Sequence, residues 1–107
     1  MLSRVITCTV QPDQVEEFRR RLNTEFLPRI QRQPGFVDNI ESIDESNGEF
    51  CCMTLWENRK SLERYDSGLF QEIAQHLEPL LQTAPEVKTM TVENSSIHHI
   101  KAGTAAA

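Results

Sequence analysis

Apolar residues recur along the first third of the chain in a pattern that predicts a strand followed by a helix. Residues 2–10, LSRVITCTV, are rich in β-branched types and end before Pro12, which indicates a strand. Asp13 and Glu16 then have the spacing of a helix capping box. Pro28 is expected to end or kink this helix near the preceding residue, because proline lacks a donor and clashes with the previous turn. One apolar stripe runs along the predicted helix at three- and four-residue steps: Val15, Phe18, Leu22, Phe26 and Ile30.

The middle of the chain carries the signals of a β-hairpin. A turn, QPG at residues 33–35, precedes a predicted strand over residues 36–44. The segment ESNG, residues 45–48, is a strong hairpin turn signal. Residues 49–57 then predict a third strand.

A second helical region and a last strand follow the hairpin. Asn58 can cap a short helix that carries Tyr65 and breaks around Gly68. Pro85 ends the next helix, and residues 87–93 alternate as a fourth strand. The order β-α-β-β-α-β predicts a ferredoxin-like α+β fold, in which one antiparallel sheet carries its helices on a single face. The second amphipathic helix is marked by Leu69, Phe70, Ile73, Leu77, Leu80 and Leu81.

Both faces of the third predicted strand are apolar. Its sequence FCCMTLWEN places Phe50, Cys52, Thr54 and Trp56 on one side and Cys51, Met53 and Leu55 on the other. Helices on one face leave the other face uncovered. We therefore expect a homodimer in which two copies pack sheet against sheet around a two-fold axis.

Composition narrows the class of protein. We expect one domain over residues 1–94 and a tail over 95–107 that is flexible or docks on a partner through Ile97 and Ile100. The net charge of -5 opposes binding to nucleic acid or an anionic membrane. No apolar run approaches the roughly 20 residues of a membrane span, and the first residues lack the pattern of a signal peptide. We expect a cytoplasmic protein.

The cysteines indicate packing rather than chemistry. Cys8, Cys51 and Cys52 are an odd number, and two are adjacent, so no disulfide framework is expected. Cys8, Cys52 and His76 lack the paired spacing of a metal site, and no metal is expected. No Gly-rich phosphate loop, nucleophile elbow or dinucleotide-binding unit is present in the sequence.

Several short motifs across residues 3–93 match those of one known family: Val10-Gln11-Pro12-Asp13 with Val15, Glu17 and Phe18; Pro34-Gly35-Phe36; Leu55-Trp56-Glu57; Tyr65; Phe70; and Leu80-Leu81 followed by Pro85-Glu86-Val87. This arrangement is similar to the dimeric α/β-barrel superfamily, and within it to the antibiotic biosynthesis monooxygenase (ABM) domain. The resemblance implies a dimer with one pocket per subunit between helices and sheet. It implies oxidation of a planar aromatic or quinol-type molecule by oxygen without a cofactor.

Three candidate residues for this chemistry each have a second interpretation. Trp56 either stacks on a flat substrate or seals the end of the core. His76, at the edge of the apolar helix stripe, either accepts a phenolic proton or is a boundary histidine. Tyr65 either hydrogen-bonds a ligand or caps the core. The predicted site thus has His76 and Tyr65 as catalytic residues; its substrate-binding residues are Trp56, Phe36, Ile6 and Ile40.

Other polar residues of the strands receive more ordinary predictions. Asn39 and Glu41 are expected on the dimer-facing side of the second strand. Arg4 is expected on the helix side near a sheet edge, where it could bind an anionic substituent of a ligand, although a solvated side chain is the more ordinary prediction.

Two alternatives to an oxygenase remain. The apolar pocket side, with Ile6, Phe36 and Ile40, also suits a dimer that binds a small ligand without turnover. In the heme-degrading branch of the superfamily, a helix histidine ligates iron beside a strand asparagine and a strand-ending tryptophan. Trp56 matches that branch, but Ile6 and Ala74 stand at the other two positions, so heme degradation is the lesser alternative.

Overall fold

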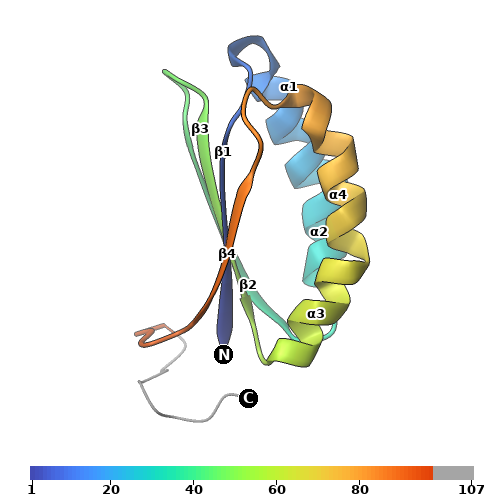
Figure 1. Cartoon of the computed structure of the whole chain (residues 1–107), viewed down its shortest axis with the longest axis vertical. Coiled ribbons are helices and arrows are strands. Elements are labelled where there is room, and N and C mark those ends of the chain that lie inside the picture. Colours follow the sequence, from blue (N-terminus) through green and yellow to red (C-terminus); the bar gives the residue numbers. More distant parts are fainter. Residues whose placement is uncertain (98–107) are drawn as a thin grey trace.

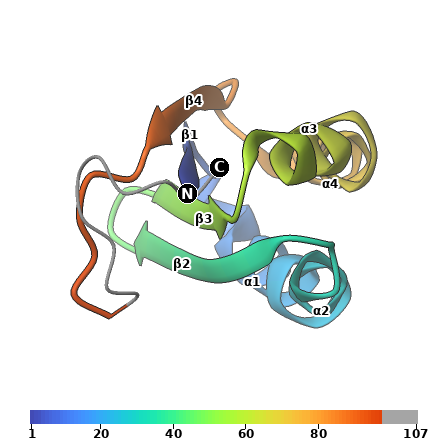
Figure 2. The same cartoon turned by 90° about the horizontal axis from the view of Figure 1, so that it is seen from below.

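Four antiparallel strands form one sheet, and the helices of the described chain cover one side of it (Figures 1 and 2). The computed structural model describes residues 1–97. Neighbouring strands run in the order β2-β3-β1-β4, so the two central strands are β1 and β3. This topology confirms the predicted ferredoxin-like α+β fold. The strands are β1 (Leu2–Thr9), β2 (Phe36–Asp44), β3 (Glu49–Trp56) and β4 (Glu86–Thr91).

The first helical connection is longer than the sequence predicted. A 3₁₀ turn at Pro12–Gln14 leads into α1 (Val15–Arg20), a π-helical segment (Arg21–Phe26) and α2 (Leu27–Gln31). Pro28 does not end the helix, because it lies in the first turn of α2, where a missing N–H costs little. The predicted capping box is wrong: neither helical start has a side-chain cap, and Asp13 lies inside the 3₁₀ turn. The apolar stripe is confirmed, since every member is buried: Val15, Phe18, Leu22, Phe26 and Ile30.

The hairpin between β2 and β3 closes as predicted. Gly48 has a positive φ of 78°, a conformation that favours glycine. Its carbonyl accepts a hydrogen bond of 2.8 Å from the Val10 amide. A Cβ at position 48 would collide with the Val10 carbonyl, so the turn also fixes the end of β1.

The second helical connection consists of α3 (Arg59–Ser67), α4 (Leu69–Leu77) and a 3₁₀ turn at Glu78–Leu80. The Asn58 side chain accepts a 2.9 Å hydrogen bond from the Ser61 amide, which confirms the predicted cap. The break between α3 and α4 falls at Gly68, as expected.

A β-bulge interrupts β2 near its start. Phe36 pairs with Trp56, but the next pair along β3 joins Leu55 to Asp38, so Val37 is an extra residue. Since side chains alternate across a strand, one extra residue exchanges the two faces of β2 from that point on.

The chain beyond β4 turns toward the side of the sheet away from the helices (Figures 1 and 2). The Val92 amide donates to the Met1 carbonyl at 2.9 Å, and Ile97 is 78% exposed. Docking of residues 95–107 on a partner stays a prediction, and Ile100 lies outside the described residues. Within residues 1–97, no helix is long and apolar enough to span a membrane.

Candidate functional site

A cavity of about 510 Å³ lies between the helices and the sheet. Most of its lining is apolar, with a few polar side chains, which is the usual composition of a small-molecule site. Its sheet side is formed by Ile6, Cys8, Phe50 and Cys52. The helices supply Phe18, Leu22, Ile30, Tyr65, Phe70, Gln71, Ile73, Ala74, Gln75 and Leu77, and the segment between α4 and β4 supplies Glu78, Leu81, Gln82, Thr83, Ala84 and Pro85.

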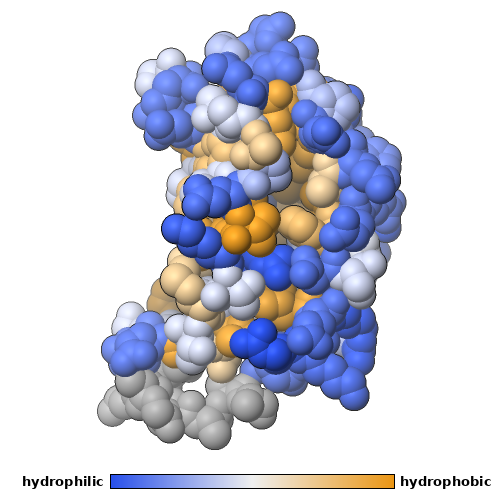
Figure 3. Space-filling model, in the orientation of Figure 1, coloured by the Kyte–Doolittle hydropathy of each residue, from blue (hydrophilic) through white to orange (hydrophobic). Residues whose placement is uncertain are grey.

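The mouth of this cavity follows one stripe of α4. Gln71, Ala74, Gln75 and Glu78 recur at three- and four-residue steps, so they share one side of the helix and its 3₁₀ extension. Residues 82–85 are also exposed and also line the cavity. Seen from the β4 side, apolar side chains gather in a hollow between strand and helix, flanked by hydrophilic ones (Figure 3). The sequence did not lead us to predict these residues at the site, although Gln71, Gln75 and Glu78 form a polar stripe beside the apolar one.

Tyr65 contributes a hydroxyl group to the cavity. The residue is 3% exposed, and its hydroxyl makes no hydrogen bond to the described part of the chain. Every fully buried side-chain polar atom in that part has a partner, so the Tyr65 oxygen is left facing cavity space. Burial raises the pKa of Tyr65 well above its usual value. The group therefore remains protonated at neutral pH and can donate a hydrogen bond.

Trp56 packs against the Tyr65 ring. The indole is fully buried, stacks on the Tyr65 ring at 4.6 Å between centroids, and donates to Thr54 Oγ1 at 2.9 Å. The Phe36 ring meets the indole edge to face at 5.9 Å. Neither Trp56 nor Phe36 lines the cavity. Of the predicted substrate-binding residues, Ile6 alone contacts this space.

The bulge in β2 moves Ile40 away from the cavity. Ile40 pairs with Met53 on the side of the sheet without helices and is 54% exposed. Its expected pocket-facing placement is wrong, because Val37 reverses the alternation.

Because of the same bulge, the polar side chains of Asn39 and Glu41 lie on the side of the sheet that faces the helices. Asn39 Nδ2 donates to Glu41 Oε2 at 3.0 Å, and Cys52 Sγ donates to Asn39 Oδ1 at 3.3 Å. The expectation that Asn39 and Glu41 face a dimer partner is therefore wrong. Glu41 lines a small adjoining cavity of about 160 Å³ together with Asn23.

His76 lies on the exposed side of α4. Its Nδ1 is 2.9 Å from the Glu72 carbonyl, and its ring contacts the edge of Phe26 at 5.7 Å. It is absent from the cavity lining, so the geometry gives no support to its predicted role as base. No histidine of residues 1–97 lines the cavity, and Ile6 and Ala74 do, so the lining does not fit the histidine ligation of the heme-degrading branch.

Arg4 is buried, contrary to the expectation of a solvated side chain. Its Nη1 lies 2.8 Å from Asp66 Oδ1, and its Nε donates to Thr89 Oγ1 at 3.1 Å. The guanidinium also lies over the Phe70 ring, 5.5 Å from the centroid. The sequence could not reveal this pairing, because its partners come from α3 and β4.

The cysteines in the cavity are poor nucleophiles. Burial raises the pKa of Cys8 to about 11, and burial followed by the nearby Glu41 carboxylate raises that of Cys52 to about 12. Of the three cysteines, only Cys51 has an exposed side chain. No group of three or more histidine, cysteine or acidic side chains that could hold a metal occurs within residues 1–97.

Alkylation with iodoacetamide at pH 8 should therefore modify at most one thiol of the native chain, at Cys51. A thiol of pKa about 11 is only about 0.1% thiolate at that pH, so Cys8 and Cys52 should react only as the pH approaches their raised pKa values. Mass spectrometry should find all three cysteines modified after denaturation. C51A is the control and should leave the native chain unmodified; modified Cys8 or Cys52 peptides from folded protein would contradict the assignment.

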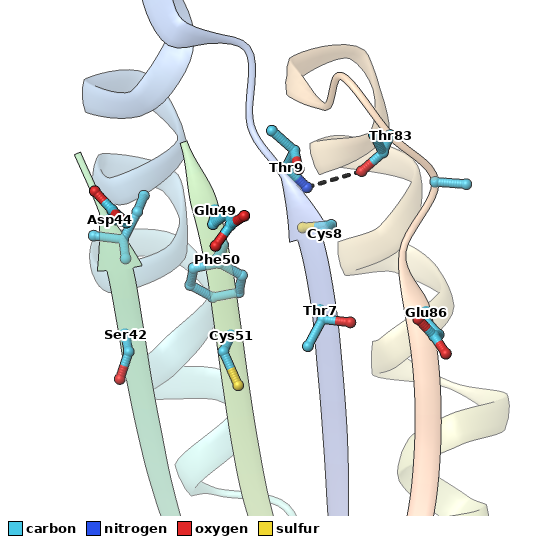
Figure 4. Close-up of a pocket in the computed structure, with 12 residues that line it drawn as sticks. Thr7, Cys8, Thr9, Ser42, Asp44, Glu49, Phe50, Cys51, Thr83 and Glu86 are labelled. Atoms are coloured by element: carbon cyan, nitrogen blue, oxygen red, sulfur yellow. Dashed lines mark hydrogen bonds between the residues drawn. The ribbon is translucent and has the colours of Figure 1, made fainter. Parts of the chain in front are cut away.

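A second hollow, of about 670 Å³, lies on the other side of the sheet (Figure 4). Asp44, Glu49 and Glu86 surround it with carboxylates, and Thr7 and Ser42 add hydroxyl groups. It occupies one end of the sheet face that carries no helices. Its lining mixes polar and apolar side chains, whereas the cavity beneath the helices has a mainly apolar lining and is the better candidate for an aromatic ligand.

Solved structures share this fold. A monooxygenase from the gene ActVA-Orf6 of Streptomyces coelicolor, in complex with Nanaomycin D, matches with a TM-score of 0.74 at 17% identity, covering 88% of this chain and 88% of that one. SnoaB, a cofactor-independent oxygenase from Streptomyces nogalater, matches with a TM-score of 0.69 at 20% identity, covering 89% and 95%. A conserved protein from Methanosarcina mazei Go1 matches with a TM-score of 0.71 at 22% identity, covering 84% and 91%. No curated protein matches the chain.

The fold and cavity define a ferredoxin-like α+β domain with an internal pocket between one sheet face and its helices. The family model described as antibiotic biosynthesis monooxygenase matches residues 1–84. The chain therefore belongs to the ABM family, as its motifs indicated.

Proposed function

We propose that this chain is a cofactor-independent monooxygenase that oxidises a planar aromatic molecule of quinol type in the cavity beneath the helices. The observation that carries the proposal is the Tyr65 hydroxyl, which has no hydrogen-bond partner within residues 1–97 and belongs to a residue that lines a largely apolar cavity. Membership of the ABM family and the shared fold of a cofactor-independent oxygenase support the same reaction.

In this proposal Tyr65 donates a hydrogen bond to a phenolic oxygen of the substrate. The substrate enters as the neutral phenol and releases its proton to water at the cavity mouth, and the donor stabilises the negative charge that develops on the phenolic oxygen. The electron-rich ring then passes an electron to oxygen, the two radicals combine to a peroxide anion, and this anion takes up a proton from water to give a hydroperoxide. Loss of water leaves a quinone, so one oxygen atom enters the ring and the other leaves as water. The substrate supplies all the electrons, and no external reductant is needed.

The surrounding residues would hold and shield this reaction. Ile6, Phe50 and Ile73 give the ring an apolar environment and exclude water. Trp56 acts as a positioning residue, because its stacking fixes the Tyr65 ring. Ligand binding without turnover is the second candidate function, favoured by the lack of a lysine, arginine or histidine in the cavity lining formed by residues 1–97.

Oxygen uptake with a panel of phenols, quinols and anthrones tests the proposed reaction. We expect consumption of one oxygen molecule per quinone formed, with one labelled atom in the product when ¹⁸O₂ is used. Y65F should lower the turnover number by about 10–100-fold, because it removes the proposed hydroxyl donor to the phenolic oxygen while keeping the ring. H76N is the matched control and should keep wild-type turnover, since His76 lies outside the cavity. A ligand that raises the melting temperature without oxygen uptake would favour the binding function.

We propose further that the chain works as a homodimer through the sheet face without helices. The pairing of the strands places Val5, Ile40, Met53 and Met90 together on this face, and we call them the open-face patch. Ile40 is 54% and Met90 48% exposed, which is costly for apolar side chains in water. A second copy packed face to face would cover both patches at once.

A further inference from the structure

The cavity beneath the helices has an uneven distribution of charge. Among residues 1–97, no lysine, arginine or histidine lines it, whereas Glu78 contributes a carboxylate. The other polar lining groups are uncharged: the Tyr65 hydroxyl, the Thr83 hydroxyl and the amides of Gln71, Gln75 and Gln82. An anion inside this space would meet no positive charge at the walls.

The buried guanidinium of Arg4 is already neutralised by an ion pair. Arg4 lies against Phe70, which lines the cavity, but its guanidinium is paired with the Asp66 carboxylate at 2.8 Å. Its Nε is also occupied by Thr89. Arg4 therefore offers little attraction to an anionic ligand on the other side of the Phe70 ring.

Glu78 and Tyr65 lie at opposite ends of α4. Tyr65 belongs to α3, before the start of α4, and Glu78 follows the last residue of α4. Nine helical residues rise about 13.5 Å, so the two polar groups are separated along the length of the cavity. Glu78 is exposed and shares the stripe that forms the mouth.

We infer that Glu78 makes this cavity selective by charge: it admits neutral or cationic aromatic ligands and rejects anionic ones of the same shape. The inference deepens the proposed function and rests on its assignment of the cavity as the ligand site. A ligand would place an oxygen acceptor at the Tyr65 end and a neutral or amino substituent toward Glu78. A carboxylate-bearing ring loses its hydration in the apolar interior and gains no cationic partner there. Glu78 adds repulsion at the mouth.

Three aromatic probes of similar size separate these effects: naphthamide, naphthoate and naphthylmethylamine. Their affinities can be measured by calorimetry at pH 7 and low ionic strength, without oxygen turnover. We expect naphthoate to bind about 100-fold more weakly than naphthamide, because its charge is desolvated without compensation. E78Q should strengthen naphthoate binding by about three- to tenfold and weaken amine binding by a similar factor, with naphthamide unchanged.

E63Q is the matched control, because Glu63 is an exposed carboxylate of α3 outside the cavity lining. It changes the net charge of the chain by the same amount and should leave the three affinities as they are. Equal effects of E78Q and E63Q, or equal binding of naphthoate and naphthamide to the wild type, would overturn the inference. Failure of all three probes to bind would also overturn it, by removing the cavity as a ligand site. The expected order of affinities without any oxygen uptake would leave the inference standing and remove only the proposed reaction.

Discussion

A74W should abolish ligand binding, lowering the affinity for naphthamide and the rate of oxygen uptake by about 100-fold or more. Ala74 lies in the middle of the mouth stripe, between Gln71 and Glu78, and its methyl group lines the cavity. An indole at this position would occupy the space that an aromatic ligand needs. Overpacking a well-filled core costs about 1–3 kcal/mol, and the adjoining cavity should keep the cost near the lower end.

Calorimetric titration with naphthamide and a thermal melt of the same sample check this expectation. K60W is the control, because it adds the same indole to an exposed position on α3 outside the cavity. It should bind naphthamide as the wild type does. A folded A74W variant with unchanged affinity would mean that the ligand binds elsewhere, and the hollow on the opposite sheet face would be the next candidate.

I40E should convert the proposed dimer into monomers, weakening self-association by about 100-fold or more. Ile40 belongs to the open-face patch and is 54% exposed in the single chain, so a glutamate there should be tolerated by the fold. In a two-fold dimer the substitution would place two carboxylates in one apolar interface, where like charges cost several kcal/mol. Light scattering coupled to size-exclusion chromatography measures the change as a halving of the mass.

V87E is the matched control for this change. Val87 is 42% exposed, but it pairs with Ile6 on the helix side of the sheet. V87E introduces the same charge without touching the open-face patch, and it should leave the mass of the dimer unchanged. A wild-type chain that is monomeric at micromolar concentration would contradict the dimer proposal outright.

The parts of the fold that were predicted correctly depend on local signals. The bounds of β2, the turn before Gly48 and the Asn58 cap follow from backbone chemistry within a few residues. The apolar stripe of the first helix was also predicted, because burial of one helical face repeats with a fixed period. The family resemblance was found through such elements, and the family match confirms it.

The parts of the site that were missed depend on contacts between distant segments. Arg4 is buried because Asp66 lies 62 positions away and still reaches its guanidinium. His76 is adjacent to Leu77 in the sequence, but one step along a helix rotates a side chain by about 100°, which is enough to move it from core to solvent. Tyr65 was predicted either to bind a ligand or to cap the core, and its place in the cavity lining depends on the packing of α3 against the sheet, which no local signal reveals.

The bulge at Val37 determines which side chains of β2 face the helices. Side chains along a strand alternate between the inward and the outward face of the sheet, and one extra residue shifts every later position to the face opposite to the one that unbroken alternation would give. Downstream of Val37 the inward set is Asn39, Glu41 and Ile43, whereas unbroken alternation from Phe36 would place Asp38, Ile40, Ser42 and Asp44 inward. A related strand that pairs the same residues without the bulge would therefore place the opposite set of side chains beneath its helices, whereas a strand that lacks the residue at position 37 would keep the inward set seen here. For this strand, an alignment that ignores the bulge compares residues that lie on opposite sides of the sheet.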